Sequence, residues 1–485
     1  MAPAIVIVGS GHAGLCLGIA LKRAGFDDFT ILEKAPRLGG TWRDNTYPGA
    51  ACDSPSFAYS FSFEPKADWS RKWAPQPEIL AYLEHCADKY GLRPHLRCDT
   101  ELAEARFDAG TRRWHLRTTG GETLEADILA SAVGQLNRPV VPAIPGLDTF
   151  AGPRWHSARW DHTVALEGKR VGVIGNAASA VQLVPAIAPR VQQLRVFQRS
   201  PNWVFEKNDR VYPSWEQALY ARVPAVARLY RWWLWLSYEL RFPVIREQPF
   251  MTRRATRMAH ELLEAQVPDP ALRRRLTPDY AIGAKRLLIS DDYFPALQRA
   301  NVDLICDPID RIEPDAVVTR DGARHPIDVL ILATGFDSTS FLSPMRIAGP
   351  DGRTLEELWP GGPEAYLGVS VAGLPNFFMM YGPNTNLGHN SIIFMIECQT
   401  RYILDCLRQM QERALQSIDL RPEVQAQYNR ALTRALEGTA WARIPRSWYK
   451  DAGGRITNNW PHSTITYWWR TRRADLTLYR VTPRR

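Results

Sequence analysis

Three glycines near the N-terminus have the spacing of a turn that binds nucleotide phosphates. Gly9, Gly11 and Gly14 follow an apolar, β-branched run at 5–8. The first glycine permits a tight turn, the second lets the backbone approach a pyrophosphate, and the third allows a helix to pack closely on a strand. With the acid Glu33, 24 residues after Gly9, this pattern predicts a dinucleotide site. The alternative is an ordinary tight turn between a strand and a helix.

A second turn of the same kind begins at Gly175, after an apolar strand predicted at 170–174. Ala177 stands where the first turn has its middle glycine, so the backbone is expected to approach a pyrophosphate less closely here. Ala180 replaces the third glycine, a change that the motif tolerates. We therefore expect Gly175 and Ser179 to contact a second nucleotide, and this prediction rests on the whole strand–turn–helix–strand unit.

The residues after the second strand of each unit indicate different nucleotides. Glu33 would accept hydrogen bonds from ribose hydroxyls and would repel a 2′-phosphate, which suits FAD or NAD. Arg199 and Ser200 follow the second unit, and an arginine beside a hydroxyl fits a 2′-phosphate. The two sites are therefore complementary, and we predict FAD at the first and NADPH at the second.

Both turns need a strand before them, a helix after them and a second strand beyond the helix. Apolar periodicity predicts the first unit's second strand at 29–32, and the second unit's at 194–197, each after a helical pattern. The predicted fold class is α/β, with two Rossmann-like dinucleotide-binding domains, for FAD and NADPH, and a helical insertion.

The chain is expected to pass from the first domain to the second and back again. Prolines and a glycine between 139 and 146 mark the first crossing, and a second crossing follows the strand that ends near Leu332. We therefore assign 1–150 to the first part of the FAD-binding domain and 151–335 to the NADPH-binding domain. Residues 336–485 complete the FAD-binding domain and add a C-terminal segment on the substrate side.

The insertion, at about 214–280, is helical and rich in aromatic residues. Its aromatic side chains include Tyr230, Trp232, Trp233, Trp235 and Tyr238. We favour packing inside the protein, or a lid over the substrate, for this run. Contact with a membrane surface is the alternative, which the charged residues Arg231, Glu239 and Arg241 within and beside the run make less favoured.

Charge and cysteine usage exclude several other classes of protein. The 485-residue chain has a net charge of +9, yet its basic residues form no long run, so nucleic-acid binding is not expected. Its seven cysteines include no CxxC pair, which argues against a disulfide framework and a zinc site and is typical of a reducing cytoplasm. No apolar stretch is long enough to predict a transmembrane helix or a secretion signal.

A longer motif lies where the two predicted domains join. Residues 150–161 match the pattern F-x-G-x-x-x-H-x-x-x-W followed by Asp, through Phe150, Gly152, His156, Trp160 and Asp161. In this stretch the chain resembles the Baeyer–Villiger monooxygenases, which are class B flavoprotein monooxygenases. The resemblance implies that His156 couples domain orientation to cofactor contacts and does not transfer protons.

Further stretches of the chain resemble the same family in the family's order. They are Gly39-Gly40-Thr41-Trp42, Tyr47-Pro48-Gly49 with Asp53, Lys285-Arg286-Leu287, Ala333-Thr334-Gly335-Phe336-Asp337, Gly388-His389-Asn390-Ser391 and Ser447-Trp448. One departure follows Trp448, where the family's commonest pattern is not kept. Together the stretches span nearly the whole chain.

The resemblance implies an oxidoreductase that uses NADPH and O₂ to convert a ketone into an ester or lactone. NADPH would reduce FAD, O₂ would add at the flavin C4a, and the resulting peroxyflavin would attack the carbonyl of a small-molecule ketone. Arg286 would stabilise the negative oxygen with its permanent charge, and Asp53 would hold the guanidinium in place. Judged only by their residue types, Arg286 and Asp53 would more often form an ordinary salt bridge. The family motifs around each residue favour the active-site role instead.

The remaining cofactor contacts also come from the resemblance. Lys285 is a second cation for the 2′-phosphate, with a solvated surface lysine as the alternative. Trp42 and Tyr59 would line the flavin pocket, with simple core packing as the alternative, and Trp448 would reach the region of the nicotinamide and the substrate. Cofactor contacts are expected at four further positions: Gly40, Ala333, Thr334 and Gly335.

Two other functions remain open on the sequence. A heteroatom oxygenase, which makes sulfoxides or N-oxides, needs only a change in the protonation of the same flavin species. A flavin-binding protein that does not oxygenate any substrate belongs to a different class. Product analysis distinguishes a heteroatom oxygenase from a ketone oxygenase. A purified protein that is yellow and consumes NADPH is an active flavoprotein, which distinguishes both oxygenases from a flavin-binding protein that does not oxygenate.

Overall fold

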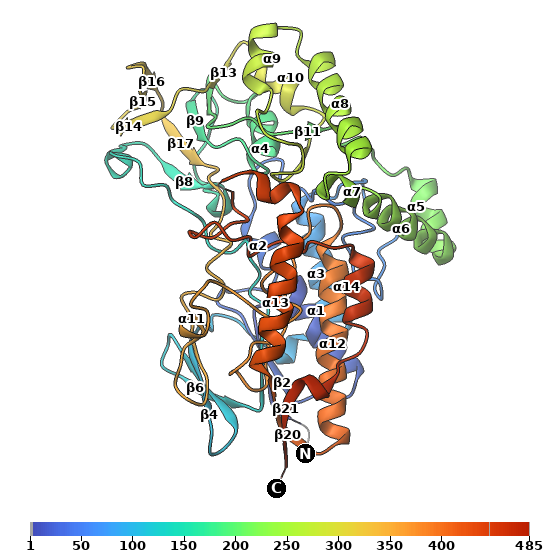
Figure 1. Cartoon of the computed structure of the whole chain (residues 1–485). Helices are drawn as coiled ribbons and strands as arrows, with labels where there is room; N and C mark the ends of the chain where they lie inside the picture. The colour runs from blue at the N-terminus through green and yellow to red at the C-terminus, as the bar shows by residue number, and fades with distance from the viewer. Residues whose placement is uncertain (1–2, 446, 485) are drawn as a thin grey trace.

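The computed structural model describes residues 3–445 and 447–484 and shows two α/β lobes joined by extended segments (Figure 1). Each lobe is built on a five-stranded parallel sheet. The lower sheet has the order β19 (Phe377–Met379), β7 (Ile128–Ser131), β1 (Ile5–Val8), β2 (Phe29–Leu32) and β3 (Leu96–Arg97). The upper sheet has the order β13 (Val302–Ile305), β10 (Gln193–Phe197), β9 (Arg170–Ile174), β17 (Val329–Leu332) and β8 (Arg154–His156).

The strands predicted at 5–8, 29–32, 170–174 and 194–197 are confirmed at these positions. In each sheet the strand before the glycine turn is the central one, with its successor on one side and a later strand on the other. β1 lies between β2 and β7, and β9 lies between β10 and β17. The order of the strands therefore reverses at each glycine turn, which is where α/β sheets bind ligands.

The lower sheet is buried on both faces, as its uninterrupted apolar strands require. Ile5 and Ile7 pack in one core with the helices α1 (His12–Arg23), α3 (Gln76–Lys89) and α12 (Ile392–Glu412). Val6 and Val8 point to the other face and pack with a second sheet. That sheet comprises β18 (Arg346–Ala348), β4 (Leu102–Asp108), β5 (Arg113–Thr118) and β6 (Thr123–Ala126).

The upper sheet repeats this arrangement. Val171 and Val173 pack against α4 (Ala180–Ile187) and α10 (Tyr293–Leu297). On the other face, Ile174 and Leu330 pack against a small antiparallel sheet. Its strands are β14 (Ile309–Glu313), β15 (Ala316–Thr319) and β16 (Arg324–Pro326).

Helices occupy most of 214–276, and two of them project away from both sheets (Figure 1). The helices are α5 (Ser214–Arg222), α6 (Pro224–Glu239), α7 (Phe242–Ile245), α8 (Pro249–Gln266) and α9 (Pro270–Leu276). The short parallel pair β11 (Val204–Phe205) and β12 (Leu288–Ile289) joins the two ends of this insertion.

The last part of the chain returns to the lower lobe. α12 packs on α1, so the N-terminal glycine unit and the C-terminal segment share one core. The elements that complete this segment are α11 (Leu355–Leu358), α13 (Pro422–Glu437), α14 (Thr464–Arg470) and the antiparallel pair β20 (Leu415–Leu420) and β21 (Tyr479–Pro483), while the short helix α2 (Thr41–Asp44) belongs to the first part of the lobe.

Two further expectations concern cysteines and membrane spans. All seven cysteines are free. Among the described residues, no helix combines the length and the apolar character needed to cross a bilayer.

Candidate functional site

The first glycine turn has the geometry that each expected role requires. Gly9 has a φ of +105°, and a Cβ there would lie 2.7 Å from the carbonyl oxygen of Ala132. A Cβ on Gly14 would lie 1.8 Å from the carbonyl oxygen of Gly9, so only glycine permits this packing of α1. A Cβ on Gly11 would meet only Gly40 Cα, at 3.8 Å, which leaves its backbone open to a ligand.

Glu33 lies beside this turn, at the carboxyl end of β2, and its buried carboxylate already has three hydrogen bonds and an ion pair. Ser10 donates from its N–H (3.1 Å) and its hydroxyl (2.6 Å), Ala35 N–H donates at 3.0 Å, and Arg43 Nη1 lies 2.9 Å away. A carboxylate offers about four acceptor sites. A ribose that bound Glu33 would therefore replace one of these donors, a competition that the sequence did not indicate.

Arg286 and Asp53 form an ion pair across the two lobes. Arg286 precedes β12, and Asp53 lies in the loop after α2. Arg286 Nε donates to Asp53 Oδ2 at 2.9 Å, and its Nη2 binds the same oxygen. The two side chains are 31% and 32% exposed. The charge of Asp53 raises the pKa of Arg286 above its ordinary value, so the guanidinium stays charged at any working pH.

Three tyrosines lie near the ion pair, and of these the sequence indicated only Tyr238, as part of the aromatic insertion. Tyr381 and Tyr449 are close enough to Arg286 for its charge to oppose the rise in pKa that burial causes in both phenols. Burial raises the pKa of Tyr238, on α6, to about 12, and the nearby Asp53 adds to that rise. Two neutral phenols therefore lie near the Arg286 cation, and a third lies near Asp53.

A buried network of amides lies behind Tyr381. The hydroxyl of Tyr381 donates to Asn386 Oδ1 at 2.7 Å, and Asn386 Nδ2 donates to Asn459 Oδ1 at 2.7 Å. Gln135 Nε2 donates to the carbonyl oxygen of Tyr381 at 3.2 Å. Side-chain amides are rarely buried this deeply without a polar ligand or close pairing. The asparagine-rich runs near 384 and 458 are therefore the sequence feature from which a buried polar network could have been predicted.

Several buried polar atoms in this region have no hydrogen-bond partner among the described residues. They are Gln135 Oε1, Thr457 Oγ1 and Asn458 Oδ1. Unpaired buried acceptors are costly, and native proteins rarely keep them without a ligand or water. Together with the open backbone at Gly11, they fit a polar, ring-shaped ligand such as an isoalloxazine bound between the glycine turn and Arg286.

Aromatic side chains close the space next to the turn. Trp42 Nε1 donates to the hydroxyl of Tyr59 at 3.2 Å, and the two rings meet edge to face with centroids 5.6 Å apart. His12 packs edge to face on Tyr59, and burial lowers the pKa of His12 to about 3. Trp448 packs on Tyr449, with ring centroids 4.6 Å apart, which places it on the Arg286 side.

The second glycine turn is less regular than the first. Gly175 has a φ of +110°, and a Cβ there would lie 2.3 Å from the carbonyl oxygen of Ala333. α4 begins only at Ala180, whereas α1 begins directly after Gly11. Ser179 precedes the helix as its N-cap residue without a side-chain capping bond. Its hydroxyl is therefore not committed to the helix end.

Two cations and a hydroxyl meet beyond β10. Lys285 Nζ donates to Ser200 Oγ at 2.8 Å. Burial lowers the pKa of Lys285, and the neighbouring charge of Arg199 lowers it further. Within 3–445 and 447–484, neither cation forms an ion pair with a carboxylate. Asp279 is near enough to raise the pKa of Lys285 but does not pair with it, so two like charges held close together fit a bound anion.

The fingerprint at 150–161 lies beside the crossing segments. The ring of buried His156 packs edge to face on Phe336, and its Nδ1 accepts a hydrogen bond from Ala158 N–H at 3.1 Å. A Cβ on Gly152 would lie 2.3 Å from the carbonyl oxygen of Asp328, and Phe150 is buried. Asp161, at the far end, accepts hydrogen bonds from the N–H and the hydroxyl of Thr163.

The two crossing segments pair with each other. Val140 N–H donates to the carbonyl oxygen of Gly335 at 2.9 Å, and Thr334 Oγ1 donates back to the carbonyl oxygen of Val140. Ala333 is hydrogen-bonded to β9 through Ile174. Ala333, Thr334 and Gly335 are therefore next to the second glycine turn and to the junction of the lobes.

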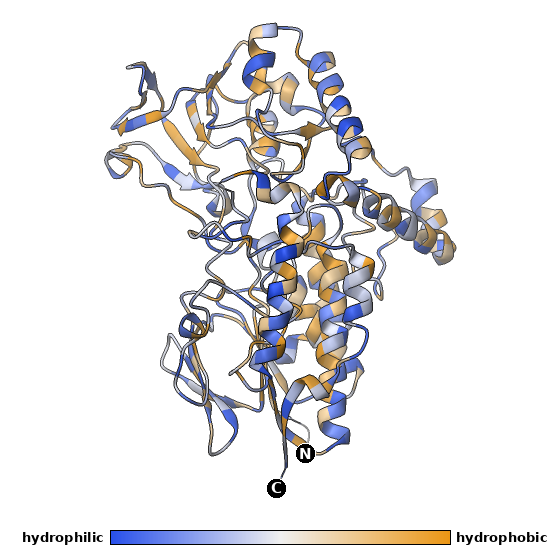
Figure 2. Ribbon diagram, viewed as in Figure 1, coloured by the Kyte–Doolittle hydropathy of each residue, from blue (hydrophilic) through white to orange (hydrophobic). Residues whose placement is uncertain are grey.

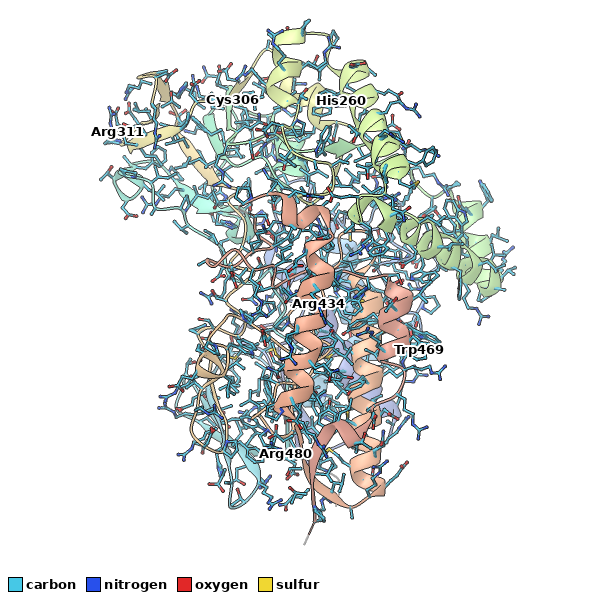
Figure 3. All side chains as sticks on the ribbon, in the orientation of Figure 1. His260, Cys306, Arg311, Arg434, Trp469 and Arg480 are labelled. Carbon is cyan, nitrogen blue, oxygen red and sulfur yellow. The ribbon has the colours of Figure 1, made fainter. Side chains whose placement is uncertain are left out.

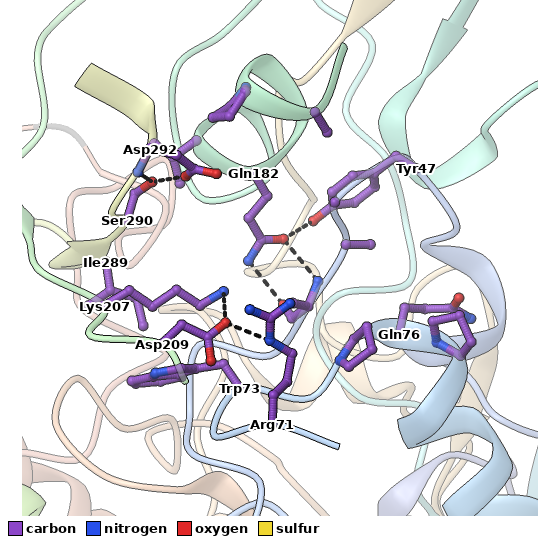
Figure 4. Close-up of a pocket in the computed structure, with 18 of the residues that line it drawn as sticks. Tyr47, Arg71, Trp73, Gln76, Gln182, Lys207, Asp209, Ile289, Ser290 and Asp292 are labelled. Carbon is purple, nitrogen blue, oxygen red and sulfur yellow. Dashed lines mark hydrogen bonds and ion pairs between the residues drawn. The ribbon is translucent and has the colours of Figure 1, made fainter. Parts of the chain in front are cut away.

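A third contact between the lobes is made by Gln182 of α4, which lines a pocket of about 420 Å³ (Figure 4). Its Oε1 accepts hydrogen bonds from the hydroxyl of Tyr47 at 2.9 Å and from Ala51 N–H at 3.3 Å. Its Nε2 donates to the carbonyl oxygen of Ala51 at 3.0 Å. Gln182 thus fixes the backbone two residues before Asp53. The residues that line this pocket do not include Arg286 or Asp53.

Comparison with known proteins extends over the whole chain. The sequence model of the family described as "Pyridine nucleotide-disulphide oxidoreductase" matches residues 6–223. A protein of Streptomyces coelicolor named "Baeyer-Villiger monooxygenase" is 45% identical over 479 residues, covering 98% of this chain and 92% of that protein.

Two solved structures show the same fold over nearly all of both chains. An oxidized steroid monooxygenase bound to NADP is 32% identical, with a TM-score of 0.90 and all of both chains covered. An OTEMO complex with FAD and NADP is 26% identical, with a TM-score of 0.89, covering 99% of this chain and 100% of that one.

Proposed function

The chain belongs to the Baeyer–Villiger monooxygenases, and from that premise we propose which of its residues bind the cofactors and promote oxygen transfer. The protein is a flavoprotein monooxygenase that uses FAD and NADPH and inserts one oxygen atom of O₂ next to a ketone carbonyl. We propose that 1–150 and 336–485 form the FAD-binding domain and that 151–335 form the NADPH-binding domain.

FAD is assigned to the first glycine unit. The open backbone at Gly11 and the start of α1 would bind the pyrophosphate, and Glu33 would bind the ribose after one of its present donors turns away. Gly40 faces Gly11 across the same space. Trp42 and Tyr59 would enclose the flavin, which is supported by their contact with each other beside the turn.

NADPH is assigned to the second unit. Arg199, Lys285 and Ser200 would bind the 2′-phosphate, because together they supply two positive charges and a hydroxyl. Gly175 and Ser179 would contact the pyrophosphate. The segment 333–335 and the fingerprint around His156 would transmit the position of this cofactor to the junction of the lobes.

The pairing of Arg286 with Asp53 is the observation that carries the assignment of the reacting region. Bound FAD supplies, once NADPH has reduced it, the activated oxygen for the ketone. Arg286 would then stabilise negative charge on oxygen through its fixed cation, and Asp53 would orient that cation. Tyr381, Tyr449 and Trp448 would exclude water from the substrate, because they pack around Arg286.

Product analysis tests the ketone assignment. The holoenzyme is given a ketone and a sulfide of similar size together with NADPH, and the products are separated by chromatography. We expect esters or lactones as the main products, because Arg286 stabilises the oxyanion of a carbonyl adduct. Sulfoxide alone, at undiminished NADPH consumption, would identify a heteroatom oxygenase instead.

Replacing Arg199 with alanine tests the NADPH assignment. We expect the KM for NADPH to rise about 10-fold to 100-fold, since one charge-assisted hydrogen bond contributes about 1.5–3 kcal/mol. The KM for NADH should stay nearly constant, because NADH has no 2′-phosphate. Steady-state kinetics with both nucleotides give the answer, and equal changes in the two values would remove Arg199 from the 2′-phosphate site.

A further inference from the structure

The projecting helix α6 is apolar on both of its faces, and only one of them is buried. Ala227 and Leu234 pack into the protein. Leu229, Trp232 and Trp233 lie on the opposite face and are 70%, 66% and 60% exposed. Helical spacing places Leu236 and Leu240 on the same stripe, and both are exposed. The expectation that the aromatic run packs inside the protein is therefore wrong for the two tryptophans at its centre.

The exposed stripe extends onto the neighbouring helix. Trp215 and Leu219 are spaced for one face of α5 and are also exposed. Figure 2 shows the two helices projecting from the right of the molecule. We call the exposed apolar residues of α5 and α6 the hairpin face: Trp215, Leu219, Leu229, Trp232, Trp233, Leu236 and Leu240.

The hairpin is held firmly at its base, so its outer face is presented in a fixed direction. Arg231 donates from Nη1 to the carbonyl oxygen of Ser60 at 2.8 Å. Buried Glu239 accepts hydrogen bonds from Thr464 N–H at 2.8 Å and from Asn390 Nδ2 at 2.9 Å. These contacts join α6 to three separate parts of the chain. The exposure of the hairpin face is thus a property of a structured element.

The surroundings of the hairpin face are strongly basic. Residues 211–258 contain eight arginines and no lysine or aspartate, against three glutamates. Each glutamate has a partner within the protein: Glu216 with Arg210, Glu239 with His389 and Glu247 with Arg443. Arg222, Arg228 and Arg241 are exposed. An apolar surface edged by unneutralised arginines is complementary to an anionic interface with an apolar interior.

We propose that the hairpin face docks on the surface of an anionic lipid bilayer, with α6 lying in the interfacial plane. Tryptophan is the side chain that most favours the boundary between water and lipid, and each nearby arginine adds attraction to anionic headgroups. A second copy of this chain fits the surface poorly. A two-fold contact through one patch would bring the same arginines against each other.

Docking there would bring the bilayer close to the reacting region. Tyr238 comes between Leu236 and Leu240 of the stripe in the sequence, but it lies on the inner side of α6, near Asp53. Arg241 stacks on the Tyr238 ring, with its guanidinium carbon 3.9 Å from the ring centroid. One helix therefore has lipid-facing residues on its outer side and a residue of the Arg286 site on its inner side. Apolar ketones dissolved in lipid would reach the site over a short distance.

Vesicle flotation with the holoenzyme tests this proposal. Vesicles of phosphatidylcholine alone are compared with vesicles that also contain phosphatidylglycerol, at low and high salt. We expect binding to the anionic vesicles that is at least about tenfold stronger than to the neutral ones and that weakens in high salt. The double variant Trp232→Gln/Trp233→Gln should lose about tenfold or more of this binding, since both indoles leave the interface.

The matched control is Val141→Gln/Val481→Gln, which removes two exposed apolar side chains elsewhere on the protein. The contribution of charge to vesicle binding is measured by comparing two double variants that each lose two positive charges. Arg222→Gln/Arg228→Gln removes arginines of the hairpin, and Arg311→Gln/Arg480→Gln removes arginines that lie far from it in Figure 3. FAD content verifies the fold of every variant. Equal flotation of the tryptophan variant and the wild type would overturn the proposal. So would a wild-type dimer that becomes monomeric in the tryptophan variant without any vesicle binding.

Discussion

Replacing Arg286 with alanine is expected to abolish ketone oxygenation while FAD and NADPH still bind. The rate of ester formation should fall by at least about 100-fold, which is the usual loss when one donor to a developing oxyanion is removed. The ion pair with Asp53 holds the cation in one direction, so no neighbouring group can replace it. Among the nearby side chains, Tyr381 and Tyr449 are neutral and cannot supply the missing charge.

The measurement records ester formation and NADPH consumption in the same reaction. We expect NADPH oxidation to continue with formation of hydrogen peroxide, because the variant keeps the nucleotide sites. The rate of ester formation by Arg286→Lys should lie between those of the wild type and Arg286→Ala, since lysine keeps the charge but loses the planar pair of donors. Arg480→Ala, at an exposed arginine far from the site, is the control (Figure 3). Undiminished ester formation by Arg286→Ala would remove this residue from the reaction.

Gly11→Ala is expected to release FAD without damaging the fold. Gly11 has a φ of −77°, which alanine adopts freely, and the nearest protein atom to the new Cβ is 3.8 Å away. The added methyl group would instead occupy the space through which the backbone meets the pyrophosphate. A steric penalty of about 1–3 kcal/mol corresponds to weakening of FAD binding by up to about 100-fold.

The measurement is the FAD content per chain after gel filtration, together with urea unfolding at saturating FAD. Gly120→Ala is the matched control, because it adds a methyl group at another open position without positive φ. Gly14→Ala should instead lower the free energy of unfolding, since its Cβ would collide with the carbonyl oxygen of Gly9. Full FAD content in Gly11→Ala would argue against a pyrophosphate at this turn.

The glycine units could be predicted from the sequence because their information is local. Strand, turn and helix follow one another within a few residues, and the structure has the strands at 5–8 and 170–174 where the pattern placed them. The irregular start of α4 agrees with the alanine at 177, which was the visible departure from the motif. The pairing of Arg286 with Asp53 is different. It joins residues far apart in the chain, and only the family resemblance suggested it.

Other features depend on three-dimensional packing that periodicity does not encode. Ser10 and Arg43 share the carboxylate of Glu33 because a turn and a short helix happen to converge there. The apolar pattern of α6 covers both faces, so it could not indicate that Trp232 and Trp233 are the exposed pair. The amides near Asn386 and Asn459 resemble loop residues in sequence and are buried only after the C-terminal segment folds back.

The hydrogen bonds from Gln182 to Ala51 and Tyr47 set a mechanical condition on the whole molecule. α4 begins at the second glycine turn, and Ala51 lies two residues before Asp53. While these bonds last, a rotation of the upper lobe against the lower one about this contact would keep Ala51 attached to α4. Such a pivot would let the more distant parts of the NADPH-binding lobe swing through large arcs while Asp53 hardly moves.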